Sequence, residues 1–259
     1  MNVRAIFITG AASGIGKATA QLFARQNWRV GLADLDGQAL DALASDIGAG
    51  AMALPVDVTD AAALRAAIDA FTAATGGRLD ALFNSAGLLD MRLFEDAPIE
   101  RLHAIIDVNV KGVINGIMAA SPALKATPAS TIITMSSAAA IFGVPQQAVY
   151  SASKFAVRAL TEALHVELAP HDIWVCDIMV SFVDTPMLRD AAHKAASIDR
   201  VGVNVTPEQV AQCVLDAITN RHLHVFVGDA ERRMATLFDA VPWDQRAARI
   251  GALVPLPDR

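Results

Sequence analysis

Short apolar runs alternate with longer stretches of mixed polarity along the whole chain. The short runs are near-continuous rather than interrupted by polar residues at every second position. This pattern is typical of strands that are covered on both faces of a parallel sheet. The runs predict strands at 5–9, 30–33, 51–56, 81–83, 131–135 and 174–180, and a last strand at 224–227.

The longer stretches between these runs are predicted to be helices. They span 15–26, 37–47, 61–75, 99–124, 150–169 and 207–220, and the stretch 99–124 is long enough to hold two helices. Thr206 followed by Pro207 marks the start of the last one, with threonine as the N-cap and proline in the first helical position.

This order of strands and helices indicates right-handed βαβ units. The predicted fold class is therefore α/β, a Rossmann-type doubly wound parallel sheet of about seven strands with helices on both faces. No linker, charge block or repeat divides the chain, so we expect a single domain over residues 1–259. Sheets of this kind bind ligands beyond the carboxyl ends of their strands, and the residues that follow each strand are therefore the candidates for chemistry.

Composition narrows the classes of partner. The apolar fraction is 54%, but no run of about 18 uninterrupted apolar residues predicts a membrane span. The first apolar run is too short for a signal peptide, so we expect a cytoplasmic protein. A net charge of −6 argues against nucleic acid as the main partner. Cys176, Cys213 and the histidines have no metal-ligand spacing, so we expect no metal.

A glycine-rich turn follows the first predicted strand, in the spacing Gly10-x-x-x-Gly14-x-Gly16. Such a turn lets backbone N–H groups and a helix N-terminus face a pyrophosphate, although an ordinary strand–helix turn is the alternative. Asp34 ends the second strand, where a carboxylate accepts from both ribose hydroxyls of NAD and repels the extra phosphate of NADP. Ser13 and Leu35 supply no offsetting cation. We therefore expect NAD (NADH) rather than NADP, the alternative being a solvated Asp34.

Tyr150 is the only tyrosine of the chain, and Lys154 follows it by four residues in a predicted helix. The two side chains therefore share a helix face. A nearby ammonium group stabilises a phenolate and makes it a usable acid or base near neutral pH. The pair by itself is equally compatible with a half-buried tyrosine and a solvated lysine.

Five motifs in this order resemble the short-chain dehydrogenase/reductase family from residue 5 to about residue 186. They are the turn at 9–16, Asn84-Ser85-Ala86-Gly87, Asn109, Ser136-Ser137 and Tyr150-x-x-x-Lys154. The resemblance implies that Tyr150 is the general acid/base and that Lys154 holds the nicotinamide ribose and keeps Tyr150 acidic. It also implies that Ser137, by its spacing from the tyrosine, hydrogen-bonds the reacting oxygen, and that Asn109 completes a water-linked proton relay. Asn109 as a residue of a helix kink is the alternative.

The same resemblance implies the cofactor contacts, with Asp57 and Val58 beside the adenine and Val183 and Thr185 at the nicotinamide carboxamide. The whole set is Gly10, Ser13, Gly14, Ile15, Gly16, Asp34, Asp57, Val58, Asn84, Ala86, Gly87, Tyr150, Lys154, Val183 and Thr185. Asn84 as a mostly structural residue is an alternative. Residues 180–185 lack the Pro-Gly that the family often shows there, which leaves the path of this loop open.

The expected activity is hydride transfer between nicotinamide and a secondary alcohol or ketone. The apolar segment 138–144, with Leu88 and Leu89, indicates a hydrophobic substrate, although packing among these side chains or against another subunit is as plausible. We expect 184–205 to form a substrate lid and the tail 230–259 to pack on the core or in an interface. The resemblance implies a homodimer or homotetramer.

Three other functions stay open at this point. The first is an NADPH-dependent carbonyl reductase on the same fold, against which Asp34 argues. The second is a non-redox epimerase or dehydratase with tightly held NAD, because this fold hosts several chemistries. The third is a nucleotide-binding sensor or scaffold without turnover, against which the set of Asn109, Ser137, Tyr150 and Lys154 argues.

Overall fold

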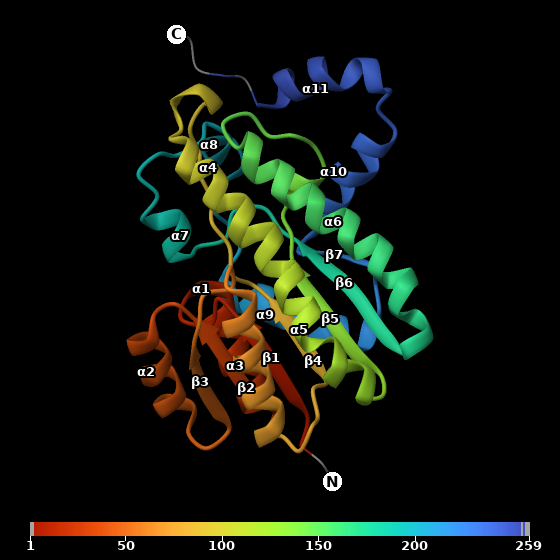
Figure 1. The fold of residues 1–259 in the computed structure, drawn as a ribbon. Coiled ribbons are helices and arrows are strands. Elements are labelled where there is room, and N and C mark those ends of the chain that lie inside the picture. The colour runs from red at the N-terminus through yellow and green to blue at the C-terminus, as the bar shows by residue number, and fades with distance from the viewer. Residues whose placement is uncertain (1–2, 255, 257–259) are drawn as a thin grey trace.

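The computed structural model describes residues 3–254 and 256, and within them the chain forms one seven-stranded sheet (Figure 1). The strand order is β3-β2-β1-β4-β5-β6-β7, and every neighbouring pair is parallel. The strands are β1 (Ala5–Thr9), β2 (Arg29–Asp34), β3 (Ala51–Pro55), β4 (Ala81–Asn84), β5 (Ser130–Met135), β6 (Ile173–Met179) and β7 (His224–Phe226). The predicted fold class is confirmed: this is a single Rossmann-like domain.

Helices cover both faces of the sheet (Figure 1). The α-helices of the described residues are α1 (Gly14–Arg25), α2 (Gly37–Ile47), α3 (Ala61–Ala74), α4 (Ile99–Ile106), α5 (Val113–Ala126), α6 (Ala148–Leu168), α7 (Pro186–Arg189), α8 (Ser197–Val201), α9 (Pro207–Asn220), α10 (Asp229–Asp239) and α11 (Arg246–Leu253). The strands and helices predicted from the pattern begin and end within two residues of the observed bounds, apart from the stretch 99–124. The capping box of Thr206 and Gln209 starts α9 where the sequence places it.

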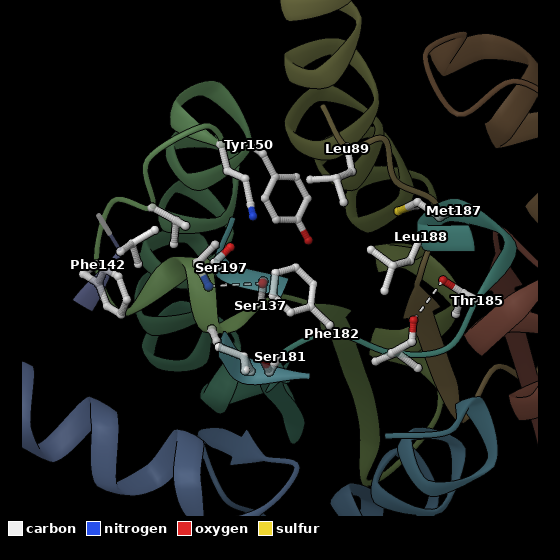
Figure 2. Close-up of a pocket in the computed structure, with 17 residues that line it drawn as sticks. Leu89, Ser137, Phe142, Tyr150, Ser181, Phe182, Thr185, Met187, Leu188 and Ser197 are labelled. Atoms are coloured by element: carbon white, nitrogen blue, oxygen red, sulfur yellow. Dashed lines mark hydrogen bonds between the residues drawn. The ribbon is translucent and has the colours of Figure 1, made fainter. Parts of the chain in front are cut away.

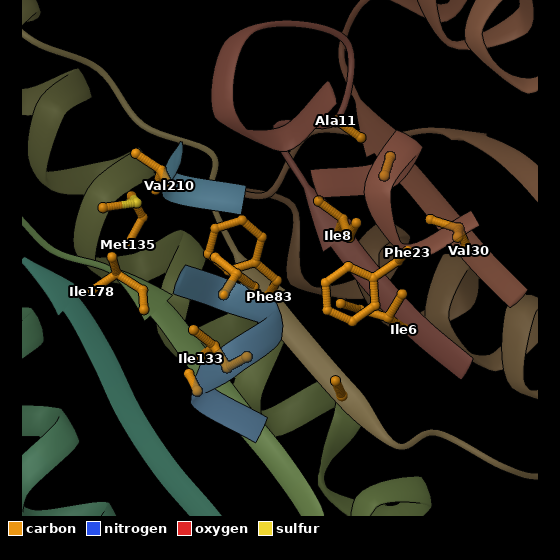
Figure 3. Close-up of a cluster of buried hydrophobic side chains, with 14 of the residues drawn as sticks. Ile6, Ile8, Ala11, Phe23, Val30, Phe83, Ile133, Met135, Ile178 and Val210 are labelled. Atoms are coloured by element: carbon orange, nitrogen blue, oxygen red, sulfur yellow. The ribbon is translucent and has the colours of Figure 1, made fainter. Parts of the chain in front are cut away.

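Each face of the sheet has its own apolar layer. Phe23 of α1, Leu40 of α2 and Val210 of α9 pack on one face, together with Ile8 of β1 (Figure 3). On the other face, α3, α5 and α6 pack against Phe7 and its neighbours. All five residues of β1 are buried, which explains why this strand shows no alternation of apolar and polar residues.

The stretch 99–124 departs from a simple pair of helices. A π-helical segment at Asp107–Gly112 joins α4 to α5 without a break. By length and composition alone, Ile99–Ala126 could cross a membrane, but α5 packs against α3, and α4 packs against α6. The segment is a core helix of this fold.

Four helices lie in the segments expected to form the lid and the tail. In the lid, α7 and α8 follow β6. In the tail, Phe238 of α10 is fully buried and stacks on Phe142, with 4.4 Å between ring centroids. Ile250 and Leu253 of α11 pack against the same cluster. Residues 255 and 257–259 of the expected tail lie outside the described residues.

Candidate active site

The register of the sheet brings the ends of β1, β2 and β4 together, because Thr9 lies opposite both Ala33 and Asn84. The turn that follows β1 can only be built from glycine at two positions. A Cβ on Gly10, which has a φ of +68°, would lie 2.7 Å from the backbone nitrogen of Ala86. A Cβ on Gly16 would lie 2.0 Å from the carbonyl oxygen of Gly10. The chain therefore folds back tightly at the start of α1.

The N-terminus of α1 is free of a side-chain cap. Ser13 occupies the N-cap position, but its hydroxyl makes no capping hydrogen bond. The first N–H groups of a helix have no partner within the helix, and the helix dipole adds positive potential there. This end of α1 therefore suits an anion such as a pyrophosphate.

Asp34 is fixed at the edge of the same turn. Its Oδ2 accepts a hydrogen bond from the backbone N–H of Ala12 at 3.0 Å, and its Oδ1 accepts from the N–H of Asp36 at 3.3 Å. The side chain thus ties the end of β2 to the glycine turn. Asp34 thus presents its carboxylate at the end of β2 beside the glycine turn, the position predicted from the sequence.

These elements enclose a hollow of about 320 Å³ at the carboxyl ends of the strands. Most of the predicted cofactor contacts line it: Gly10, Ser13, Gly14, Ile15, Gly16, Asp34, Asp57, Val58, Ala86, Gly87 and Thr185. The sequence prediction missed Leu35, Val56, Ser85, Leu88, Val108 and Met187 as lining residues. Most of these residues are neighbours in sequence of predicted contacts. Their closeness to a strand end could therefore have identified them as lining residues.

Asn84 does not line the hollow. It is 2% exposed, its Nδ2 donates to Thr134 Oγ1 at 3.4 Å, and its Oδ1 faces Gly116, where a Cβ would lie only 2.5 Å away. In this position Asn84 joins β4, β5 and α5. The geometry favours the structural alternative for this residue.

Asn109 lies fully buried within the π-helical segment. Its Oδ1 accepts from the N–H of Leu88 at 2.7 Å, and its Nδ2 donates to the carbonyl of Leu88 at 2.9 Å and to Ser153 Oγ at 3.0 Å. The side chain thereby fixes the loop after β4 against α6. Both polar atoms of the Asn109 side chain are therefore engaged within the protein.

Tyr150 and Lys154 lie on one face of α6, with Lys154 Nζ 5.5 Å from the centre of the tyrosine ring. Lys154 is 5% exposed and donates to the carbonyl of Met135 at 2.8 Å. It therefore lies below Tyr150 rather than in the wall of either cavity. Ser137 follows β5, where its Oγ accepts from the N–H of Ala139 at 3.1 Å.

Burial shifts the pKa values of this pair. It lowers the pKa of Lys154 to about 8, although the charge of Asp177 opposes the shift. Burial also raises the pKa of Tyr150, and the Ser137 hydroxyl opposes that rise. A cationic lysine next to the ring favours the phenolate, which opposes the effect of burial on Tyr150.

A second cavity, of about 160 Å³, adjoins these side chains (Figure 2). The hydroxyl groups of Ser137 and Tyr150 face it among mostly apolar walls. Its lining comprises Leu89, Ser137, Ala138, Ala139, Phe142, Val144, Gln147, Tyr150, Ser181, Phe182, Val183, Thr185, Met187, Leu188, Ser197, Val201 and Val254. Ala140 and Ile141 of the expected apolar segment pack in the core instead. Ser136 is buried outside this lining.

The loop after β6 connects the two cavities. Thr185 and Met187 line both of them, whereas Val183 lines the second alone. Val183 pairs with Val205 in an isolated parallel bridge, and the carbonyl of Val180 accepts from the N–H of Ala138 at 2.8 Å. These contacts define the path of the loop in the absence of the Pro-Gly pair.

Known proteins are similar to this chain in sequence. A family model described as short chain dehydrogenase matches residues 4–196. The chain is 35% identical over 219 residues to the 3-oxoacyl-(acyl-carrier-protein) reductase of Thermotoga maritima, and this alignment covers 80% of this chain and 87% of that protein. It is 31% identical over 229 residues to the cyclopentanol dehydrogenase of a Comamonas species, and this alignment covers 85% of this chain and 91% of that protein.

Solved structures agree with these relatives. A short chain dehydrogenase/reductase from Burkholderia phymatum in complex with NAD matches with a TM-score of 0.83 and 26% identity, over 100% of this chain and 98% of that one. A short chain dehydrogenase from Burkholderia cenocepacia in complex with NADP matches with a TM-score of 0.81 and 25% identity, over 99% of each chain. The neighbours thus include complexes with both nucleotides.

Proposed function

The chain belongs to the short-chain dehydrogenase/reductase family, and we propose that it is an NAD(H)-dependent oxidoreductase that interconverts a hydrophobic secondary alcohol and its ketone. The observation that carries this proposal is the pair of hydroxyl groups, Tyr150 and Ser137, in an apolar cavity that shares Thr185 and Met187 with the hollow above the glycine turn.

The hollow fits a nicotinamide dinucleotide. The uncapped end of α1 and the glycine turn would hold the pyrophosphate, and Asp34 would accept from the adenosine ribose. Asp57 and Val58 would border the adenine, Lys154 would hold the nicotinamide ribose, and Val183 and Thr185 would meet the carboxamide. When bound, the nicotinamide supplies or accepts the hydride.

Asp34 supports NAD over NADP. Its carboxylate is held by Ala12 and Asp36, and no cation among the residues that line the hollow offsets its charge. A 2′-phosphate in that place would bring two negative charges together. The neighbouring structures hold either nucleotide, so this choice rests on the residues of this chain.

The residues of this chain handle the proton. In the oxidative direction Tyr150 accepts the proton of the substrate hydroxyl, and in the reductive direction it returns a proton to the developing alkoxide. The Ser137 hydroxyl donates a hydrogen bond to the same oxygen, which stabilises its negative charge. The charge of Lys154 would lower the pKa of Tyr150 against the effect of burial, and Asn109 would complete a water-linked proton relay with Lys154.

The same proposal covers the organisation of the chain. Residues 184–205, with α7 and α8, form a lid over the substrate cavity, and the tail closes it with Val254. We also propose a homo-oligomer, a dimer or tetramer, that acts in the cytoplasm. Large apolar side chains on the outside of α5 and α6 support the assembly, with Met118 62% exposed and Val166 72% exposed.

A fluorescence titration with NADH, with NADPH in parallel, tests the proposal first. We expect tight binding of NADH, weaker binding of NADPH, and NAD-dependent oxidation of at least one hydrophobic secondary alcohol at alkaline pH. Failure of both nucleotides to bind would overturn the proposal. Retention of NAD through purification, without alcohol oxidation, would point to the epimerase or dehydratase class instead.

A further inference from the structure

Two buried polar side chains in the apolar cavity have no hydrogen-bond partner among the described residues. Gln147 is 5% exposed and its Nε2 is unpartnered, and Ser197 is 4% exposed and its Oγ is unpartnered. Both residues line the cavity. Buried polar groups in folded proteins are nearly always paired, because an unmade hydrogen bond costs free energy. These two groups are therefore free to bond to water or to a bound molecule in the cavity.

The fold does not need the side chain of Gln147. The residue is the N-cap of α6, yet its side chain makes no capping hydrogen bond. Its neighbour Gln146, in contrast, accepts from the N–H of Ala196 at 2.9 Å and fastens the start of α8 to the segment before α6. This contact brings Ser197, the next residue, to the cavity. Figure 2 shows Ser197 on the same side of the cavity as Phe142.

The cavity has room for one ring. An engineered apolar cavity of about 150 Å³ holds benzene, and this one measures about 160 Å³. A molecule with a single six-membered ring therefore fits between Phe142 and Leu188. With its reacting oxygen at Tyr150 and Ser137, such a ring leaves Gln147 and Ser197 to meet another part of the same molecule.

We propose that the substrate is a single-ring secondary alcohol or ketone with a second oxygen, which Gln147 and Ser197 hydrogen-bond. The inference rests on the proposed function and adds the class of substrate. The amide N–H of Gln147 only donates, so the second group has to be an acceptor, namely a hydroxyl, carbonyl or ether oxygen. The Ser197 hydroxyl donates or accepts and can meet the same oxygen. The second oxygen is unchanged in the reaction.

The test compares cyclohexanol with the cis and trans isomers of 1,2-, 1,3- and 1,4-cyclohexanediol. We expect at least one diol to exceed cyclohexanol in kcat/KM by about tenfold or more, beyond the factor of two for its two hydroxyl groups. Gln147→Met, which keeps the length of the side chain and removes the donor, should bring this ratio close to the statistical factor. Ser197→Ala should lower it less.

Gln147→Glu sharpens the test, because it replaces a donor by a negatively charged acceptor. The preferred substrate should then shift from the diol to the corresponding aminocyclohexanol, which carries a cation. Gln212→Met at an exposed position of α9 is the matched control and should keep the wild-type ratio, since the Gln212 side chain donates to Asp216 and lines neither cavity.

Binding without turnover gives a second readout. In a Tyr150→Phe background with NAD present, calorimetry should show the diol binding about tenfold more tightly than cyclohexanol, and Gln147→Met should abolish the difference. Oxidation of cyclohexanol with no preference for any diol, or a preference that survives Gln147→Met, would overturn this inference while leaving the proposed function intact. No turnover of any alcohol and no nucleotide binding would instead refute the proposed function.

Discussion

At the scale of single residues, Tyr150 and Asp34 each give the site one chemical property that can be removed by replacing a few atoms. In the proposed function the Tyr150 hydroxyl would provide the proton, and the Asp34 carboxylate provides a negative charge at the edge of the hollow. Both side chains are fixed by surrounding structure, so that conservative substitutions test their chemistry and leave the backbone unchanged.

Replacing Tyr150 by phenylalanine should lower kcat by about 10³-fold or more, because the ring remains and the proton donor is lost. The Kd for NADH should change by less than about threefold, because the hydroxyl is not needed to hold the dinucleotide. Steady-state kinetics and the fluorescence titration measure the two effects. A variant with near-normal turnover would show that another group moves the proton.

Replacing Asp34 by asparagine should reduce the preference for NAD over NADP by about tenfold, measured as the ratio of kcat/KM values. The amide oxygen can still accept from the N–H of Ala12, while the repulsion of a 2′-phosphate is removed. Asp36→Asn is the matched control, since Asp36 caps α2 through the N–H of Ala39 and does not line the hollow. An unchanged ratio in Asp34→Asn would place the ribose elsewhere.

Sequence reasoning found most of the residues that line the cofactor hollow because chemistry follows the strand ends in this fold. It could not separate Asn84, which faces inward between β4 and α5, from Ala86 and Gly87, which face the hollow. The direction of a side chain at a strand end depends on the packed neighbours. Gln147 raised the same difficulty, because its missing partner is visible only in three dimensions.

At the scale of elements, β6, β7 and α6 share a charged network behind the active site. Asp177 of β6 is fully buried, and its Oδ1 lies 2.9 Å from His224 Nδ1 of β7. The Nε2 of His224 lies 3.3 Å from Glu162 of α6, which also receives the guanidinium of Arg158 at 2.9 Å. The charge of Asp177 also acts on Lys154.

This network binds a proton more tightly in the folded protein than in the unfolded chain. Burial raises the pKa of the Asp177 carboxyl despite the opposing effect of His224. Burial lowers the pKa of His224, but the hydrogen bond and charge of Asp177 outweigh it, so that the net shift is upward from 6.5. The resulting stabilisation is therefore present below pH 6.5 and is lost as the pH rises through the raised pKa of His224.

We therefore expect the contribution of this network to the free energy of unfolding of the wild type to fall between about pH 6 and about pH 8, below the range in which the lowered pKa of Lys154 acts in the opposite direction. Asp177→Asn should reduce this fall by about 1 kcal/mol, because the variant leaves no buried carboxylate beside a neutral imidazole at high pH. Urea titrations at both pH values measure the effect. Glu167→Gln, at an exposed position of α6 outside the network, serves as control, and equal pH slopes in Asp177→Asn and the wild type would contradict the prediction.

The elements differ in how far the sequence predicts them. The sheet and its covering helices follow from apolar runs that are buried on both faces, as in β1. The π-helical segment does not, because its shape depends on the hydrogen bonds of Asn109 to Leu88 and Ser153. The short helices of the lid and tail expose most of their surface, and α10 buries only Ala235 and Phe238, too few positions for a clear pattern.

At the scale of the whole molecule, one outer surface remains apolar. Ile114 and Met118 on α5 are 41% and 62% exposed, and Phe155 and Val166 on α6 are 37% and 72% exposed. Exposed apolar surface of this kind is typical of protein–protein contacts. In the proposed oligomer these helices would pair with those of a second copy.

Met118→Glu should therefore shift the molar mass measured by light scattering from the oligomer to a smaller species at micromolar concentration. A charge at an exposed position changes the stability of a monomer by less than about 0.5 kcal/mol, whereas in an interface it would be buried without a partner. Val3→Glu, which changes an exposed apolar residue outside α5 and α6, is the control. If the wild type is a monomer, or if Met118→Glu keeps the mass of the wild type, this surface does not mediate assembly.

The apolar cavity is lined by residues that the family model matches and by residues that follow the matched region. The family model ends at residue 196, whereas Ser197, Val201 and Val254 contribute walls from the segment that follows. Tyr150, Ser137 and the glycine turn all precede that segment. If the proposed function holds, substitutions at Ser197, Val201 and Val254 would alter which substrate is accepted while leaving Tyr150 and Ser137 in place. Substrate specificity can therefore evolve through this segment while the reaction type stays the same.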